Sequence, residues 1–190
     1  MAIVLASQSP RRQELLARIG VEDFKTLSLD IDESYPANLS PEDTVRFIAG
    51  KKSEAAAALC APDDLIITAD TMVFLGSDRL GKPQDEEDAF RMLRALSGER
   101  HTVCTGVSLR QGARCESFAV STAVYFRPMT DDEIRSYIKT GEPMDKAGAY
   151  GVQSRGALFV ERIVGDFFNV MGLPVERLGL ALTRFGVKLL

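Results

Sequence analysis

The chain opens with IVLASQSPRR at residues 3–12, a short apolar run followed by a serine-rich turn and two arginines. The apolar, β-branched part of this stretch is typical of a buried strand. Ser9 and Pro10 are residue types favoured at the N-cap and first position of a helix, so we expect a helix from there to about Ile19, ended by Gly20. A strand, a turn and a helix in succession are the repeating unit of an α/β fold.

The rest of the chain continues this alternation. Periodicity and capping predict helices at residues 44–59, 85–96, 131–139 and 174–185, and strands at residues 64–74, 102–109, 117–126 and 157–163. The segment Arg110–Gly112 predicts a hairpin turn, Ser77–Asp78 predicts another turn, and the glycine-rich residues 141–156 indicate a long functional loop. We therefore expect an α/β protein with an extended mixed sheet and flanking helices in one domain, residues 1–190.

Composition narrows the functional classes. With 190 residues, 45% hydrophobic and 26% charged, the chain can bury one substantial core. Its formal net charge of −4 predicts no general attraction to nucleic acid or to an anionic membrane surface. No stretch approaches the roughly 20 apolar residues of a membrane span, so we expect a cytoplasmic protein.

The chain lacks the residue patterns of several common structural and catalytic sites. The cysteines Cys60, Cys104 and Cys115 are odd in number and form no C-x-x-C pair, which argues against a disulfide framework or a cysteine zinc site and predicts buried free thiols. The chain contains no P-loop motif and no serine nucleophile elbow. His101, its one histidine, is predicted to be structural.

The helix start is the first candidate site. Arg11 and Arg12 lie in the first turn of a helix, where the helix dipole favours an anion over a cation. Together with the serine-bearing turn at Ser7 and Ser9 they form a candidate phosphate site. The alternative is that the arginines are solvated or paired with Asp32, Glu33 or another acid.

Asp70 is the second candidate, because it interrupts the apolar run of residues 65–74. A buried carboxylate needs a cation, a metal or strong hydrogen bonds. If the strand ends near Asp70, this residue projects at the carboxyl edge of a parallel sheet, where open α/β folds bind ligands. The alternative is a structural aspartate that caps the following turn.

Further charged groups fit the same chemistry. An acidic cluster on an expected loop consists of Asp30, Asp32 and Glu33. Ammonium groups that could meet a phosphate chain are carried by Lys51, Lys52 and Lys82. Each signal is weak alone. Carboxylates together with basic residues match magnesium-dependent chemistry on a polyphosphate.

Six ordered segments resemble the Maf family of nucleoside triphosphate pyrophosphatases. They are LASQSPRR (5–12), ADT (69–71), GKP (81–83), LSG (96–98), GEPMDKAGAYGVQ (141–153) and GLP (172–174). The resemblance implies a fold related to inosine-triphosphate pyrophosphatases, with two lobes around a central cleft, often as a homodimer. It also implies hydrolysis between the α and β phosphates of a nucleoside triphosphate.

The resemblance assigns roles to particular positions. Asp70 would accept the proton of the attacking water, and a divalent cation, Mg or Mn, would lie near Glu33 and Asp70. The phosphates would be held by Arg11, Arg12, Lys52 and Lys82. In-line attack on a polyanion requires this combination of charge neutralisation and a positioned water.

Residues 145–150, DKAGAY, with Gln153 resemble the branch of the family that acts on dTTP and UTP. The sister branch, which acts on 7-methyl-GTP, has an A-G-S-F-like sequence and a glutamate there. The Gln153 amide can pair with the uracil or thymine edge, but it can also turn over, so it does not by itself exclude CTP. The resemblance also marks Arg12 and Thr71 for specificity. Ser154 departs from the glycine common in the family at this position, so we expect the backbone there to differ from that of other members.

A different class of function stays open at this point. The family name is associated with arrest of septum formation in bacterial division, so a non-catalytic nucleotide-binding regulator is an alternative to an enzyme. The 7-methyl-GTP activity is the nearest enzymatic alternative. A nucleic-acid-binding module has poor support from an acidic chain without a basic stripe.

Overall fold

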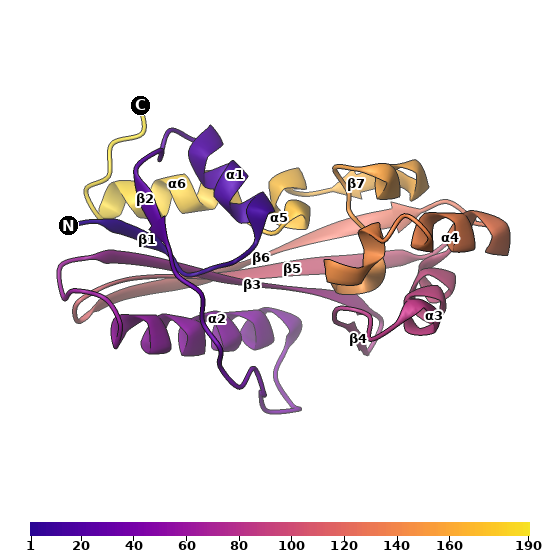
Figure 1. Cartoon of the computed structure of the whole chain (residues 1–190), viewed down its shortest axis with the longest axis horizontal. Helices are drawn as coiled ribbons and strands as arrows, with labels where there is room; N and C mark the ends of the chain where they lie inside the picture. The colour runs from indigo at the N-terminus through magenta and orange to yellow at the C-terminus, as the bar shows by residue number, and fades with distance from the viewer. The chain divides into compact units, whose positions relative to one another are not determined.

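The computed structural model describes residues 1–190, and its strands form one mixed seven-stranded sheet (Figure 1). The strands are β1 (Ile3–Leu5), β2 (Phe24–Thr26), β3 (Leu65–Leu75), β4 (Asp78–Leu80), β5 (Arg100–Gln111), β6 (Arg114–Phe126) and β7 (Val160–Val164). Their order is β2-β1-β3-β5-β6-β7, with β4 paired to β3. β1 pairs in parallel with β2 and β3, whereas β4 and β7 pair antiparallel with β3 and β6. The predicted α/β class with a mixed sheet is confirmed.

Six α-helices and three short 3-10 turns complete the chain. They are α1 (Pro10–Arg18), α2 (Pro41–Ala57), α3 (Glu86–Leu96), α4 (Asp131–Ile138), α5 (Phe167–Met171), α6 (Val175–Arg184), η1 (Glu142–Asp145), η2 (Ala147–Ala149) and η3 (Arg155–Phe159). None of the helices has the length and apolar character needed to cross a bilayer. The three 3-10 turns occupy the predicted glycine-rich loop and the residues just after it.

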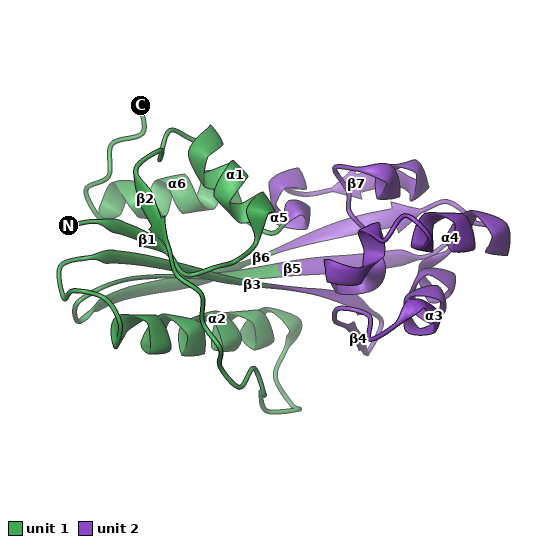
Figure 2. Ribbon diagram, in the orientation of Figure 1, with its two compact units in different colours: residues 1–70, 105–120, 172–190 green, residues 71–104, 121–171 purple.

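The chain divides into two compact units, coloured separately in Figure 2. Unit 1 consists of residues 1–70, 105–120 and 172–190, and unit 2 of residues 71–104 and 121–171. In unit 1, α2 covers one face of its part of the sheet, and α1 and α6 cover the other (Figure 2). In unit 2, α3 packs against α4, η1 and η2.

Side-chain caps explain where the helices begin. α2 starts at Pro41, earlier than the predicted residue 44, because the Ser40 hydroxyl accepts the backbone N–H of Asp43 at 3.1 Å. α4 starts after a reciprocal capping box between Thr130 and Glu133. The predicted starts of α3 and α4 are correct to within one residue.

The sequence missed the shortest elements. β2 and the five-residue helix α5 were not predicted, and the turn expected at Ser77–Asp78 lies one residue earlier because Asp78–Leu80 forms β4 against β3. The last strand begins at Val160, since residues 155–159 form a 3-10 turn. β5 extends beyond both of its predicted ends and β6 begins three residues early, so the hairpin turn lies at residues 112–113 and not at 110–112. Elements of three residues carry too little periodicity to be recognised without their pairing partner.

The cysteines are free, as predicted, but only one is buried. Cys104 is buried, Cys60 is partly exposed and Cys115 is exposed, so the expectation of three buried thiols is wrong. Cys115 is near the start of β6, immediately after the hairpin turn. The preceding residue Arg114 is exposed as well, so this end of the strand is open to solvent.

His101 is structural, as predicted. Its side chain is only 1% exposed, and its Nε2 lies 2.8 Å from the hydroxyl of Tyr150. The ring packs edge-on against Phe126 with centroids 4.9 Å apart. Burial, with a smaller contribution from the charge of Arg100, lowers the pKa of His101 from 6.5 to about 4.

This shift predicts a pH-dependent stability. Between pH 6.5 and 4 the unfolded chain binds a proton at His101 that the folded chain does not, so folding stability falls as the pH falls through this range. We expect the wild type to lose about 2 kcal/mol more than His101→Gln in its free energy of unfolding between pH 7 and pH 5. Urea unfolding at both pH values measures the difference. Equal losses in the two proteins would contradict a neutral buried His101.

A second packing constraint lies in unit 1, where β5 crosses α2 at Gly106. A Cβ on Gly106 would lie 2.3 Å from the carbonyl carbon and oxygen of Val45 and 2.6 Å from the backbone nitrogen of Arg46. These are backbone atoms of a helix and cannot move aside alone. Only glycine therefore permits this approach of strand and helix.

Gly106→Ala is expected to lower the free energy of unfolding by about 1–3 kcal/mol or more, because the helix and strand must separate. The matched control is Gly50→Ala within α2, where an added Cβ meets nothing within 4 Å. Helix propensity predicts a gain of about 0.5–1 kcal/mol there. Chemical denaturation of both variants distinguishes the two effects, and a neutral Gly106→Ala would contradict the close approach.

Candidate active site

The candidate site of unit 1 lies where β1 ends beside β3. The last parallel pair between these strands is Leu5 with Ile67, after which the chain leaves β1 toward α1. β3 itself continues to Leu75, so the idea that the strand ends near Asp70 is wrong. Asp70 nevertheless lies beyond the carboxyl end of its parallel neighbour, the edge at which α/β sheets bind ligands.

Two carboxylates meet one ammonium group at this edge. Lys52 in α2 places its Nζ 2.8 Å from Oδ1 of Asp70 and 2.9 Å from Oε1 of Glu33. Asp70 is buried, at 8% exposure, whereas Glu33 is exposed on the loop before α2. The ion pair with Lys52 compensates the burial of Asp70, and it unites three predicted site residues from three separate parts of the chain.

Arg12 is the fourth residue of this group and is held by backbone carbonyls. Its Nη1 donates to the carbonyl oxygen of Ala69 at 2.8 Å, and its Nε donates to that of Gly172 at 2.8 Å. Burial lowers the pKa of Arg12, and the negative charge of Asp70 opposes this change. Arg12 therefore joins α1 to β3 and to the segment before α6.

The serine turn supports this arrangement differently from the prediction. Ser9 occupies the N-cap position of α1, but its side chain makes no capping hydrogen bond. Instead the Ser7 hydroxyl accepts the backbone N–H of Ser9 at 3.2 Å and Nη1 of Arg12 at 3.4 Å. The first turn of α1 contains Arg11 and Arg12 and no acidic residue, unlike the first turns of α2, α3 and α4. This distribution suits an anionic ligand.

The acidic loop before α2 is internally braced. The backbone N–H of Ser34 donates to Asp32 at 2.9 Å, and hydrogen bonds from Ser34 chiefly lower the pKa of Asp32. Lys51 donates to the carbonyl oxygen of Ser34 at 3.1 Å and lies 3.7 Å from Asp32. Lys51 thus holds the loop, while Lys52, one residue later, binds Glu33.

The donor set of Glu33 and Asp70 fits a hard divalent cation. Both carboxylates already converge on one positive group, the ammonium of Lys52. No group of three or more His, Cys, Asp or Glu side chains is arranged to hold a metal by itself. Magnesium sites of one or two carboxylates completed by substrate phosphates need no larger protein cage.

Unit 2 carries the remaining predicted residues. Thr71 follows Asp70 in β3 and is partly buried, whereas Lys82 and Gln153 are exposed. The Lys82 turn is joined to the predicted loop because the backbone N–H of Gly148 donates to the carbonyl oxygen of Gly81 at 3.0 Å. Gly148 has φ of +69°, and a Cβ there would lie 2.8 Å from Val73. The glycine of the A-G-A-Y segment is therefore required by both backbone conformation and packing.

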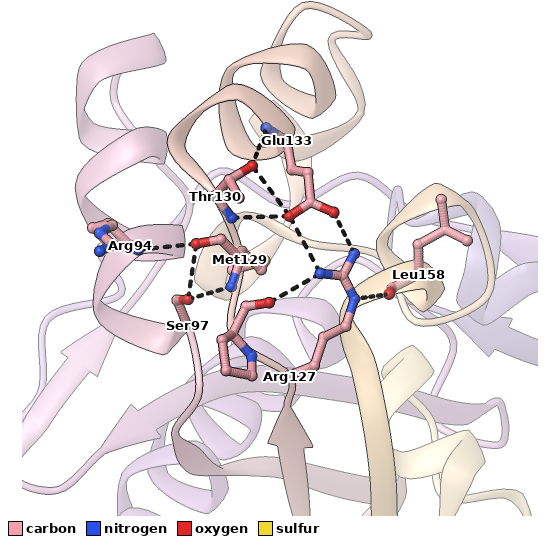
Figure 3. A network of polar contacts seen from close by, with 8 residues as sticks. Arg94, Ser97, Arg127, Met129, Thr130, Glu133 and Leu158 are labelled. Carbon is pink, nitrogen blue, oxygen red and sulfur yellow. Dashed lines mark hydrogen bonds and ion pairs between the residues drawn. The ribbon is translucent and has the colours of Figure 1, made fainter.

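A polar network around Arg127 holds the end of η3 at Leu158 (Figure 3). Arg127, after β6, binds Glu133 through two contacts of 2.7 and 3.2 Å and donates from Nε to the carbonyl oxygen of Leu158 at 2.9 Å. The Arg127 pair lowers the pKa of Glu133 to about 2. Met129 connects the network to α3 through Ser97. The far end of η3 is therefore attached to α4.

Sequence reasoning missed the acceptors of Arg12. The carbonyl oxygens of Ala69 and Gly172 bind its guanidinium, and backbone acceptors have no residue-type signature. Gly172 has φ of +113°, a conformation that favours glycine. The only indication in the sequence that Gly172 belongs to the site was the segment GLP at residues 172–174, which is part of the family resemblance.

The sequence of this chain matches a known protein family over almost its whole length. A family profile described as "Maf-like protein" matches residues 2–185. This chain belongs to the Maf family. The resemblance drawn from its motifs is confirmed, and the matched region covers both units.

Curated relatives and solved structures agree with this family assignment. A protein of Bacillus velezensis named dTTP/UTP pyrophosphatase is 47% identical over 98% of this chain and 97% of its own length. A Bacteroides fragilis protein of the same name is 48% identical over 93% of this chain and 92% of its own. The Ham1 protein of Staphylococcus aureus has a TM-score of 0.54 at 14% identity, covering 97% of this chain and 99% of that one. The Ham1 likeness shows that the fold is shared.

The contacts of Arg12 predict a stability effect in this Maf family member. Arg12→Lys cannot reach both carbonyl oxygens with fixed geometry, and we expect a loss of about 1–3 kcal/mol in the free energy of unfolding. The matched control is Arg18→Lys in the same helix, an exposed residue paired with Glu14, where a change within about 0.5 kcal/mol is expected. Thermal and urea unfolding measure both, and equal effects would contradict the bridging role.

Proposed function

We propose that this protein is a nucleoside triphosphate pyrophosphatase that hydrolyses dTTP and UTP to the monophosphate and pyrophosphate. The observation that carries the proposal is the convergence of Glu33 and Asp70 on Lys52 at the carboxyl end of β1. The names of relatives at 47% and 48% identity support the same reaction and substrates.

The phosphate chain is assigned to the basic residues and serines. Arg11 and Arg12 lie in the first turn of α1, next to the turn that contains Ser7 and Ser9. Lys52 and Lys82 would meet further phosphate oxygens, and all four cations would oppose the charge of the departing pyrophosphate. The acid-free first turn of α1 supports this role.

Asp70 is assigned the proton of the attacking water. Its Oδ1 binds Lys52, so the proton would pass to Oδ2 while the water oxygen forms a bond to the α-phosphorus. The bond from the α-phosphorus to the bridging oxygen then breaks, and pyrophosphate leaves. The Lys52 ammonium, 2.8 Å from Oδ1, holds the Asp70 carboxylate in place and leaves Oδ2 as the oxygen assigned to the proton.

A divalent cation, Mg or Mn, would be held by Glu33 and Asp70 together with substrate oxygens. Its contribution would be to neutralise charge on the phosphates. Lys52 already occupies the point where the two carboxylates meet, which supports a cation preference at that place. Glu33, which is exposed, is the ligand most able to adjust.

Base selection is assigned to Gln153, with Arg12 and Thr71 as further specificity positions. A Gln153 amide accepts from the N3–H of uracil or thymine and donates to a ring carbonyl. Gln153 is exposed on its turn and able to meet a ligand. CTP and modified pyrimidine nucleotides are the alternative substrates that this mode of base selection discriminates against least.

The test is pyrophosphate release from dTTP, UTP, CTP, 7-methyl-GTP and the purine triphosphates, with magnesium or manganese, beside Asp70→Asn. We expect dTTP and UTP to lead, chelation of the metal to stop the reaction, and Asp70→Asn to lower kcat by about 10²–10⁴-fold. The matched control is Asp78→Asn in β4, an exposed carboxylate, which should retain full activity.

Other outcomes lead to different functions. Faster turnover of 7-methyl-GTP would contradict the assigned branch of the family. Nucleotide binding without turnover by the wild type would favour a regulator of septum formation. If division arrest depends on catalysis, Asp70→Asn should abolish it in cells, whereas a pure binder would retain it.

The family resemblance also carries expectations about assembly and location. We propose a homodimer in the cytoplasm, with no nucleic-acid or membrane partner. Light scattering on the purified chain measures the oligomeric state directly.

A further inference from the structure

Glu142 gathers the turn that carries Gln153. Its Oε1 accepts the Tyr137 hydroxyl at 2.7 Å, the Ser154 hydroxyl at 2.6 Å and the backbone N–H of Gly156 at 3.2 Å. Its Oε2 accepts the backbone N–H of Arg155 at 3.3 Å. One carboxylate thus receives four donors, three of which come from the residues directly after Gln153.

The same network holds the residues before Gln153. The Tyr137 hydroxyl, which donates to Glu142, also accepts the backbone N–H of Gly151 at 3.1 Å. The Gly151 carbonyl in turn accepts the N–H of Ser154 at 3.4 Å. Val152 between them is buried at 6% exposure, whereas Gln153 is exposed. The backbone is therefore fixed on both sides of one exposed side chain.

This turn is too tightly packed to be rebuilt easily. A Cβ on Gly156 would lie 2.7 Å from the Gly151 carbonyl oxygen and 2.8 Å from the Tyr137 hydroxyl. A Cβ on Gly151 would lie 2.7 Å from the Ser154 hydroxyl oxygen. The glycines bring the two ends of the turn together. Glu142 accepts directly from the end after Gln153, and Tyr137 connects it to Gly151 at the other end.

Charge is part of this arrangement. Glu142 is partly buried, which by itself would raise its pKa, but hydrogen bonds led by those from Ser154 and Tyr137 lower the pKa overall. The carboxylate is consequently charged at neutral pH, and hydrogen bonds to a charged acceptor are the stronger kind. Lys146 also donates to the Glu142 carbonyl oxygen at 2.7 Å and so fixes the backbone of this residue.

We propose that Glu142 is a positioning residue for base selection, which acts by fixing the backbone around Gln153 through Tyr137 and Ser154. The inference rests on the proposed role of Gln153 in the pyrophosphatase reaction. Ser154, where the family commonly has glycine, takes part in the mechanism because its hydroxyl makes a contact that glycine cannot make. The network of Arg127 holds the following η3 turn at Leu158, so displacement after loss of Glu142 would be concentrated at residues 151–156 (Figure 3).

The consequence for selectivity follows from the symmetry of an amide. A glutamine that can turn over offers a complementary edge to uracil or to cytosine, so its position must be fixed if the two bases are to be distinguished. If the backbone around Gln153 could change conformation, its amide could pair equally well with uracil or with cytosine. Loss of Glu142 should therefore reduce discrimination more than it reduces binding of phosphate groups.

The experiment compares binding of UTP and CTP analogues with an imido link between the α and β phosphates, by calorimetry, to the wild type and Glu142→Ala. We expect the wild type to prefer the UTP analogue and Glu142→Ala to reduce that preference by about tenfold. Binding of imidodiphosphate, which has no base, should be unchanged. Hydrolysis of UTP and CTP by the same proteins gives a second ratio, in kcat/KM.

Milder variants protect the test against simple unfolding. Ser154→Ala removes one of four donors and should reduce the preference by about twofold to fivefold with an unchanged Tm. Glu161→Ala in β7 removes an exposed carboxylate from the same unit and should leave the preference as in the wild type.

The two proposals fail in different ways. If the wild type binds the analogues selectively but releases no pyrophosphate, the proposed function is wrong and the positioning role stands. If Glu142→Ala and Ser154→Ala keep the wild-type preference, or the wild type shows none, the positioning role is overturned whatever the enzyme activity. A loss of imidodiphosphate binding equal to that of the UTP analogue would also overturn it, because it would indicate general damage.

Discussion

The guanidinium of Arg12 is the interaction on which the architecture of unit 1 depends. It connects α1 to the carbonyl oxygens of Ala69 and Gly172, which are more than fifty residues away from it in each case. A partly buried cation is costly, as the lowered pKa of Arg12 indicates, and the charge of Asp70 offsets part of this cost. Arg12 and Asp70 are therefore electrostatically coupled. Asp70 therefore interacts with two cations of this edge, Arg12 through its electric field and Lys52 through a direct ion pair.

This coupling affects how substitutions at the site must be interpreted. Lys52 binds both Asp70 and Glu33, so neutralising one carboxylate leaves the ammonium with the other. The effect of removing Asp70 then includes a changed field at Arg12 as well as a lost proton acceptor. The neutral pair of His101 with Tyr150 in unit 2 lacks this dependence, because no opposite charge compensates it. Residues in one such network are not additive in their effects.

The sequence predicted the long elements and most of the site because their signals are local. The capping residues before α3 and α4, the apolar run of β3 and the arginines of α1 are all readable within a dozen residues. The convergence of Asp70, Glu33 and Lys52 is different, since it requires the parallel register of β1 on β3 and the packing of α2. Residue types suggested the chemistry, and only the register placed the atoms together.

What the sequence could not show are contacts made by the backbone. β2 and β4 exist because they pair with a neighbour, and the partners of Arg12 are carbonyl groups that every residue possesses. The close approach of β5 to α2 at Gly106 could not be predicted from the sequence either. An isolated glycine in a strand can mark a bulge, a bend or a close backbone contact, and the sequence does not distinguish them. These features depend on which segments meet in space.

Glu142 in unit 2 and Arg12 in unit 1 apply the same physical device with opposite charge. Arg12 collects backbone acceptors, and Glu142 collects backbone donors from Arg155 and Gly156. Arg12 binds two carbonyl oxygens, and Glu142 binds two backbone N–H groups together with the hydroxyls of Tyr137 and Ser154. Loops without regular hydrogen bonding can be held in one conformation this way. A site built on such loops gains the rigidity of a helix or strand while it keeps the irregular shape that recognition of one base requires.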